Sequence, residues 1–310
     1  MPNYGVIDLG SNTIRLVVFE VRSTKEASGG QGSTRTFRSL INDKVMAGLA
    51  AYVDDDGVFS EQGVAKAVSV LKGHAKRASY FKCKRLDVFA TAVLRNAANC
   101  NEAIEEIERG SGLPIALLSA RDEAHLGFVG ATIGREVDRG TLIDIGGGST
   151  ELTRIEGGLD LDGVSLGQGS LSSFASYVRG VIPTPIEMAA IKAALRSRLG
   201  KLPDVNEYRA ATFYGIGGSV RAAAKMHQQA LGSAQRPKSM TKKDIADLLD
   251  WCRTDPNSFA HAALKASAER VHTIVPGCII LGTLFEELSA ERLEICKYGV
   301  REGYLLERML

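Results

Sequence analysis

A polar, glycine-containing turn between two apolar strands occurs twice in this chain, and this repeat constrains the fold most strongly. The first copy lies in residues 4–21, YGVIDLGSNTIRLVVFEV, with the turn DLGSNT at 8–13. The second lies in residues 140–158, GTLIDIGGGSTELTRIEGG, with the turn DIGGGST at 144–150. Gly, Asn, Asp and Ser favour turns for local reasons, so each copy predicts a β-hairpin. Two matching hairpins this far apart predict two domains that begin alike.

The residues of both turns suit a phosphate ligand. Glycine lets backbone N–H groups converge on an anion, and Ser or Thr hydroxyls add further donors. The aspartate that ends each first strand, Asp8 or Asp144, repels phosphate but can hold a Mg²⁺ ion that neutralises it. A third turn, GIGGS at 215–219, precedes a predicted helix and offers N–H groups at the helix N-terminus. A hairpin turn without any ligand would use similar residues, so the phosphate hypothesis depends on the match between the copies.

The composition is that of an ordinary globular protein. Hydrophobic residues make up 45% and charged residues 24% of the 310 positions, and the net charge is only +2. This charge gives no reason to expect nucleic acid or an anionic membrane as a partner. No apolar run is long enough to span a membrane, and the N-terminus does not resemble a signal peptide. Five scattered cysteines argue against a disulfide framework or a zinc site, so we expect a cytoplasmic protein.

Predicted strands and helices alternate along most of the chain. Periodicity, capping residues and turn signals predict an α/β protein with a parallel or mixed sheet. Thr241 is a predicted N-cap, with Asp244 three residues on. Strands are expected at 85–91, 113–119 and the starts of 210–226 and 291–310; helices at 61–80, 101–109, 121–132, 185–199, 241–252, 277–288 and the ends of 210–226 and 291–310; and a mobile Gly/Ser/Thr-rich turn at 22–36.

Seven segments in a fixed order extend the match beyond the turns. They are GVIDLGSNTIRLVV, FATAVLRNAAN, LLSARDEAHLGF, LIDIGGGSTEL, GIGGSVRA, RVHTIVPGCIIL and YGVREGYL. Together they resemble the exopolyphosphatase and guanosine pentaphosphate phosphatase family of the actin-like ATPase superfamily. The resemblance implies an α/β fold of two actin-like (ribonuclease H-like) ATPase domains around a central cleft. The expected domains are 1–122 with about 300–310, and 123–299.

The resemblance also implies roles for individual residues. Glu123 would be the general base for the attacking water, and Arg95 would contact phosphate. Asp144 and Glu151 would belong to the metal and catalytic-water region, with Asp8 as a further metal partner. The expected cofactor is Mg²⁺ or Mn²⁺, with a monovalent cation as an additional option. The residues expected to contact substrate are Gly10, Ser11, Asn12, Thr13, Gly146, Gly147, Gly148, Ser149, Gly217, Gly218 and Ser219.

The sequence leaves several functions open. The first hypothesis is a phosphohydrolase acting on inorganic polyphosphate, and guanosine pentaphosphate is a rival substrate. A small-molecule kinase on the same fold and a non-catalytic sensor are less favoured, because Glu123 suits water activation. Relatives often carry an arginine near 165–174, where this chain has Gln168, and longer members add a C-terminal helical domain. Both departures favour short polyphosphate chains, and a homodimer is expected by family analogy.

Overall fold

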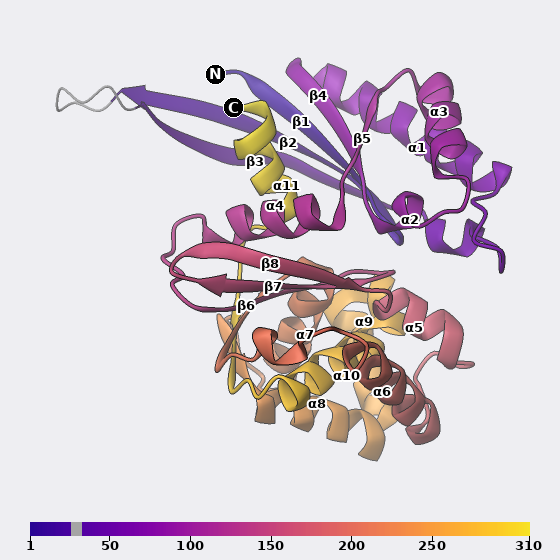
Figure 1. Ribbon diagram of the computed structural model, residues 1–310, viewed down its shortest axis with the longest axis vertical. Coiled ribbons are helices and arrows are strands. Elements are labelled where there is room, and N and C mark those ends of the chain that lie inside the picture. Colours follow the sequence, from indigo (N-terminus) through magenta and orange to yellow (C-terminus); the bar gives the residue numbers. More distant parts are fainter. Residues whose placement is uncertain (26–32) are drawn as a thin grey trace. The chain divides into compact units, whose positions relative to one another are not determined.

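The computed structural model describes residues 1–25 and 33–310, and it divides into two compact units (Figure 1). Unit 1 comprises Met1–Ser119 with Tyr304–Leu310, and unit 2 comprises Ala120–Gly303. Each unit contains its own mixed sheet and its own helices. The expected α/β class is therefore confirmed, and each unit is described separately below.

Unit 1 is built on a five-stranded sheet in the order β3-β2-β1-β4-β5. β1 pairs antiparallel with β2 and parallel with β4, so the sheet is mixed. Its strands are β1 (Asn3–Leu9), β2 (Thr13–Lys25), β3 (Ser33–Met46), β4 (Cys83–Ala90) and β5 (Ile115–Leu117). Its helices are η1 (Leu49–Tyr52), α1 (Glu61–Tyr80), α2 (Ala92–Arg95), α3 (Cys100–Ser111), the end of α11 (Val300–Tyr304) and a π-helical turn η4 (Leu305–Met309).

The long helix α1 has the predicted bounds and a capped N-terminus. The hydroxyl of Ser60 accepts a hydrogen bond from the N–H of Gly63 at 3.3 Å, which satisfies one free donor of the first turn. Ala67, Leu71 and Ala78 recur at helical spacing and are fully buried. This face packs into the hydrophobic core that also contains the buried side chains of β1 and β2.

Unit 2 is built on a six-stranded sheet in the order β10-β11-β9-β6-β7-β8. β6, β9 and β11 run parallel, whereas β7, β8 and β10 pair antiparallel with their neighbours. The strands are β6 (Gly140–Ile145), β7 (Thr150–Glu156), β8 (Leu159–Leu166), β9 (Thr212–Ile216), β10 (Ser239–Thr241) and β11 (Arg292–Ile295). The helices are α4 (Ala120–Thr132), α5 (Ser170–Tyr177), α6 (Pro185–Leu199), η2 (Val205–Tyr208), α7 (Gly217–Ala230), α8 (Lys242–Thr254), α9 (Pro256–Ser267), η3 (Ala268–Arg270) and α10 (Val271–Glu287).

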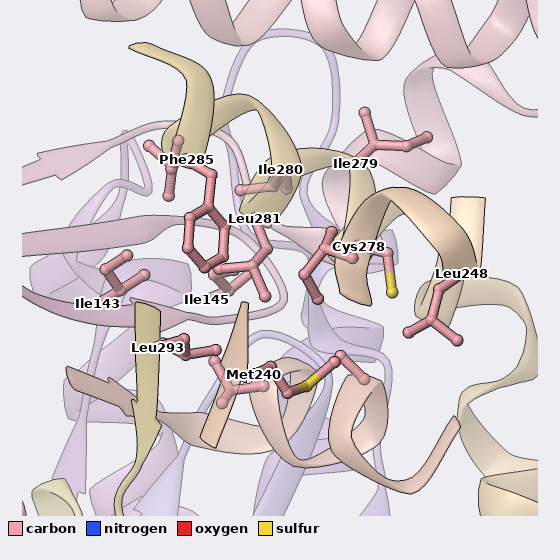
Figure 2. Packing of buried hydrophobic residues seen from close by; sticks show 14 of the residues in the cluster. Ile143, Ile145, Met240, Leu248, Cys278, Ile279, Ile280, Leu281, Phe285 and Leu293 are labelled. Carbon is pink, nitrogen blue, oxygen red and sulfur yellow. The ribbon is translucent and has the colours of Figure 1, made fainter. Parts of the chain in front are cut away.

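Helix α10 forms the centre of the unit 2 core. Figure 2 shows Cys278, Ile279, Ile280, Leu281 and Phe285 of this helix among buried side chains of other elements. The stretch Pro256–Glu287 is long and apolar enough to pass for a membrane span by composition. However, 67% of its most apolar window is buried inside unit 2, as in the core helix of a globular domain.

Most sequence-predicted elements are present, and the differences have physical causes. Helices 61–80 and 185–199 occur with the predicted bounds, and Thr241 caps α8 together with Asp244. The predicted turn at 22–36 is wrong at both ends, because strand pairing continues through Arg22 opposite Thr36; residues 26–32 lie outside the described part.

Further elements differ from expectation, and helices α5 and α9 were not predicted. Helix α10 begins at Val271, earlier than predicted, and contains Pro276 in its interior, where the missing N–H costs one intrahelical hydrogen bond. Burial of the surrounding side chains in the unit 2 core offsets that loss. Strand β8 was not predicted, since LDLDGVSL lacks an apolar alternation strong enough to identify it.

Candidate active site

The two repeated turns have the same backbone geometry. In unit 1 the N–H of Gly10 donates to the carbonyl of Thr13 at 3.1 Å, and in unit 2 the N–H of Gly146 donates to Ser149 at 2.9 Å. Each bond closes the end of an antiparallel strand pair, β1–β2 or β6–β7. The structure thus confirms both hairpins predicted from the repeat.

In unit 2, the carbonyl groups of the glycine turn are held by the start of α5. The carbonyl of Gly146 accepts bonds from the N–H and hydroxyl of Ser170, at 2.9 and 3.0 Å. The carbonyl of Gly147 accepts the N–H groups of Leu171 and Ser172, at 2.8 and 2.9 Å. The hydroxyl of Ser172 also donates to the carbonyl of Gly148, at 3.3 Å.

These contacts fix the direction of the opposite N–H groups. In a trans peptide the carbonyl of one residue points away from the N–H of the next. The N–H groups of Gly147, Gly148 and Ser149 therefore turn away from α5. Three successive N–H groups on one side form a concave anion-binding turn.

The position of Gly169 shows how closely α5 approaches this turn. A Cβ at Gly169 would collide with the carbonyl of Gly147 and the N–H of Ser149. Gln168, beside it, is 2% exposed, and its amide donates to Ser173 Oγ and the carbonyl of Ile191. This segment therefore supports the glycine turn from behind, and the amide N–H groups of Gln168 are used in the interior.

In the turn of unit 1 the carbonyl groups are also held by backbone N–H donors, here from residues 47–50. The carbonyl of Ser11 accepts the N–H of Ala50 at 2.9 Å, and that of Asn12 accepts the N–H groups of Ala47 and Gly48 at 3.1 and 3.0 Å. The N–H groups of Asn12 and Thr13 consequently point away from these partners. The side chains of Ser11 and Asn12 are themselves largely buried.

Three carboxylates meet beside the unit 2 turn. Asp144 pairs in register with Glu151 across β6 and β7, so their side chains emerge on the same face of the sheet. Glu123, in the first turn of α4, lines the same cavity as Asp144 and Glu151. The cavity is small, with a volume of about 10 Å³, and the apolar side chains of Leu142 and Ile216 share its lining with the three acidic residues.

Glu151 is strongly perturbed by its surroundings. It is only 4% exposed, and the hydroxyl of Ser165 donates to its Oε1 at 2.8 Å. Burial, followed by the nearby negative charges of Glu123 and Asp144, raises the pKa of Glu151 well above its usual range. Hydrogen bonds from Ser149 and Ser165 oppose this shift. A buried carboxylate cluster of this kind is unusual outside functional sites.

The same cluster fits a divalent cation chemically. Within the described residues, no three His, Cys, Asp or Glu side chains stand at the distances of a formed metal site. Carboxylate oxygens are nevertheless the donors that Mg²⁺ and Mn²⁺ prefer. Because Glu123 and Asp144 raise the pKa of Glu151 by repulsion, a cation among them would relieve that repulsion. Asp8 in unit 1 has a different setting, since it pairs in register with Arg15.

Helix α4, which carries Glu123, is anchored to strand β8. Arg121 Nη2 contacts Asp160 Oδ2 at 2.9 Å and donates to the carbonyl of Asp160 at 2.7 Å. His125 Nδ1 lies 3.0 Å from the same Oδ2. A Cβ at Gly163 would come within 2.9 Å of the Ala124 side chain, so the helix and strand are closely packed. Asp160 therefore fixes α4 on both sides of Glu123.

The third glycine turn lies next to the carboxylates. Gly217 has a φ of +83°, and a Cβ there would collide with the carboxylate of Asp144. A Cβ at Gly218 would collide with the guanidinium of Arg270. The hydroxyl of Ser219 is buried and donates to Ser170 Oγ at 3.2 Å. The structure therefore brings Gly217 to Asp144, and it places Ser219 behind the second turn.

Sequence reasoning missed three arginines around Asp144. Burial and the charge of Arg301 lower the pKa of Arg221 to about 10, while Asp144 opposes the shift. Burial also lowers the pKa of Arg270. The positive charge of Arg301 adds to this shift, and the negative charge of Asp144 opposes it. Each arginine lies in one of the seven matched segments. Their presence in these segments could have marked them as candidate site residues. Only the fold shows that the three arginines converge.

Arg95, the arginine that was predicted, lies in unit 1. It ends the short helix α2, and its Nη1 donates to the carbonyl of Leu118 at 3.0 Å. This bond fixes one arm of a planar guanidinium, a group whose geometry suits phosphate oxygens.

The sequence of this chain matches a protein-family model. The Ppx/GppA phosphatase family model matches residues 26–310. The chain belongs to this family. Membership makes it a hydrolase of the phosphatase class and confirms the resemblance found in the sequence.

Individual relatives agree over nearly the whole length. The chain is 25% identical to Exopolyphosphatase 1 of Mycobacterium tuberculosis, over 98% of this chain and 88% of the relative. A crystal structure of an exopolyphosphatase from Cytophaga hutchinsonii matches with a TM-score of 0.81 at 19% identity, covering 98% of this chain and 96% of the other. The Aquifex aeolicus Ppx/GppA family member matches with a TM-score of 0.75 at 21% identity, covering 98% and 96%. These structures support the two-domain actin-like fold.

Proposed function

We propose that this protein is an exopolyphosphatase, which hydrolyses the terminal phosphoanhydride of inorganic polyphosphate and releases orthophosphate. The observation that carries the proposal is the convergence of Glu123, Asp144 and Glu151 on one small cavity in unit 2, with Asp144 and Glu151 on the two strands that flank the Gly146–Ser149 turn. A terminal phosphoryl group held by that turn would lie close to a water bounded by carboxylates. The curated relatives named exopolyphosphatase support this substrate class.

In this proposal, Glu123 accepts the proton of the attacking water. Its place in the first turn of α4 is fixed by the contacts of Arg121 and His125 with Asp160. Asp144 and Glu151 lie opposite each other on β6 and β7, so they hold the other side of the cavity. Positioning the base within reach of a single water is the main requirement for in-line hydrolysis of phosphate.

Phosphate oxygens need positive charge and N–H donors during transfer. The N–H groups of Gly147, Gly148 and Ser149 supply donors in unit 2, and Arg221 and Arg270 supply charge near Asp144. In unit 1, we assign phosphate contacts to Arg95 and to the turn Gly10, Ser11, Asn12 and Thr13. Gly217 and Gly218 remain assigned to the substrate region because they adjoin Asp144 and Arg270.

A divalent cation completes the proposal. Asp144 and Glu151 would hold Mg²⁺ or Mn²⁺, with Glu123 close by. When bound, the ion would supply Lewis-acid charge to the phosphate oxygens. Asp8 is the weaker of the proposed metal partners, because Arg15 lies across the strand pair from it.

The proposal also retains a cytoplasmic location and a homodimer. All five cysteines are free thiols, as expected in a reducing compartment. The homodimer rests on family analogy.

The test is orthophosphate release in the presence of Mg²⁺ from short polyphosphate, long polyphosphate and guanosine pentaphosphate at equal phosphate concentration. We expect the highest kcat/KM with short polyphosphate, because the amide of Gln168 is occupied inside unit 2. Faster release from guanosine pentaphosphate than from polyphosphate would instead identify the protein as a guanosine pentaphosphate 5′-phosphohydrolase. ADP formation from ATP only when an acceptor is added would indicate a kinase, and binding without any release would indicate a sensor.

A further inference from the structure

A second basic pocket lies at the other end of strand β6. Its volume is about 160 Å³, and its lining includes Arg139, Arg154 and Arg209 together with Glu156 and Glu207. Arg139 immediately precedes β6, whereas Asp144 is near the end of that strand. Five residues of extended chain span about 15 Å, so this pocket is separate from the carboxylate cluster.

The wall of the pocket is fixed by buried hydrogen bonds. Thr141 Oγ1 donates to the carbonyl of Tyr208 at 2.8 Å, and the hydroxyl of Tyr208 donates to Asp162 Oδ2 at 2.7 Å. These bonds hold helix η2 on the face of β6 and β7 from which Arg154 projects, because Thr141 and Arg154 are register partners. These bonds thus link β6, η2 and β8, next to which the three arginines lie.

The positive groups of this pocket are incompletely satisfied within the described part of the chain. Arg154 Nε is buried and has no hydrogen-bond acceptor there, and Arg154 Nη1 reaches Glu156 only at 3.4 Å. A buried donor without an acceptor is unfavourable, because the group loses its hydrogen bonds to water without replacement. The side chains of Arg139 and Arg209 are exposed and make no ion pair with the described residues. An anion in the pocket would bring further acceptors to these three side chains.

We propose that this pocket binds a phosphate group, separately from the catalytic site. Arginine forks match the oxygens of phosphate, and three of them gather at this pocket, where Glu156, Glu207 and the register partner of Arg154, Asp162, balance their charge in part. A volume of about 160 Å³ accommodates a group of several heavy atoms, since one water occupies about 30 Å³. The phosphate group could come from free orthophosphate or from a longer phosphate chain.

The test follows the Nε–H signal of Arg154 by ¹H–¹⁵N NMR, identified by its loss in Arg154→Lys. Inorganic phosphate and methylene diphosphonate are titrated separately, with sodium chloride at matched ionic strength as a blank. We expect a saturable shift of this signal. The double variant Arg139→Gln/Arg209→Gln should weaken binding about 10-fold or more, as expected from the loss of charged hydrogen bonds. Exposed Arg236→Gln is the matched control and should change nothing.

The two probes separate the sources of the phosphate group. A shift with both identifies the free ion as a sufficient ligand, and a shift with diphosphonate alone identifies a chain phosphate. Either result supports the pocket. The proposal is overturned if neither probe moves the Arg154 signal, or if the double variant binds as the unchanged protein does. The readout does not require turnover, so it is independent of the exopolyphosphatase assignment.

Discussion

Asp144 lies directly across the β6–β7 pair from Glu151, so two carboxylates share one face at the end of the second hairpin. At the equivalent place of the first hairpin, Asp8 lies across from Arg15. The backbone repeat is therefore preserved while the charge differs. The pairing in unit 2 concentrates negative charge next to the N–H groups of a glycine turn, and this combination suits a cation and a phosphate together.

Glu151→Gln should make the protein more stable but less active. The substitution removes a buried negative charge that Glu123 and Asp144 repel, so we expect the free energy of unfolding to rise by about 1 kcal/mol without added metal. Phosphate release should fall at least about 100-fold, because the acidic cluster loses one of the carboxylates proposed to hold the divalent cation. Thermal unfolding and steady-state assays with increasing Mg²⁺ measure both effects.

The matched control for Glu151 is exposed Glu136→Gln, which should alter neither quantity. A Glu151→Gln protein that is less stable and equally active would show that the carboxylate has a purely structural role.

Gly169→Ala tests the support of the second phosphate turn. Its new Cβ would collide with the carbonyl of Gly147, so the turn must shift or α5 must move. We expect a loss of about 1–3 kcal/mol in stability and a larger loss in kcat/KM than in most α5 variants. The neighbouring Gly167→Ala is an ideal control, since a Cβ there meets nothing within 4 Å. Equal behaviour of the two variants would contradict the proposed role of α5.

Asp160→Asn tests whether the anchoring of α4 positions Glu123. The variant keeps the side-chain volume but weakens the ion pairs with Arg121 and His125. We expect kcat to fall about 3–10-fold with KM nearly unchanged, and stability to fall by no more than about 1 kcal/mol, because both partners are partly exposed. Asp250→Asn, which breaks a surface pair with Arg253, controls for general charge loss. A change in KM alone would argue against positioning.

The buried His74 predicts a pH dependence of unit 1 stability. Its Nε2 donates to the carbonyl of Ile14 at 3.2 Å, and Asp43 and Arg77 are the charged groups beside it. Burial is the main cause that lowers the pKa of His74 below its usual value near 6.5. Below that pH the unfolded chain binds a proton that the folded chain excludes. Stability should therefore decrease as the pH falls from about 7 to 5.

Chemical denaturation at several pH values measures this effect. His74→Gln should flatten the decrease, whereas exposed His261→Gln should leave it unchanged. A His74→Gln protein with the same pH dependence as the unaltered chain would show that another group is responsible.

Local signals predicted much of this structure. Thr241 and Asp244 before α8 satisfy helix donors within a few residues, so the start of this helix could be predicted from the sequence. The two hairpins could also be predicted, because their turn residues and strands are adjacent in the sequence.

The features that sequence reasoning missed depend on contacts between distant segments. Arg221, Arg270 and Arg301 come together only because α7, η3 and α11 converge near Asp144. The need for glycine at position 169 arises from a carbonyl more than twenty residues earlier. Roles for Glu123 and Arg95 came from the family resemblance, since a single Glu or Arg carries no such signal alone.

The central claim is that Glu123 activates the attacking water, and single-turnover hydrolysis of prebound short polyphosphate tests it most directly. Enzyme in excess over substrate is compared for the unaltered protein and Glu123→Gln, with polyphosphate binding measured separately. The account predicts binding within a few-fold of normal and a hydrolysis rate lowered about 100- to 10,000-fold, the usual contribution of a general base. Hydrolysis within a few-fold of the normal rate would contradict it, because the water would then be activated by another group.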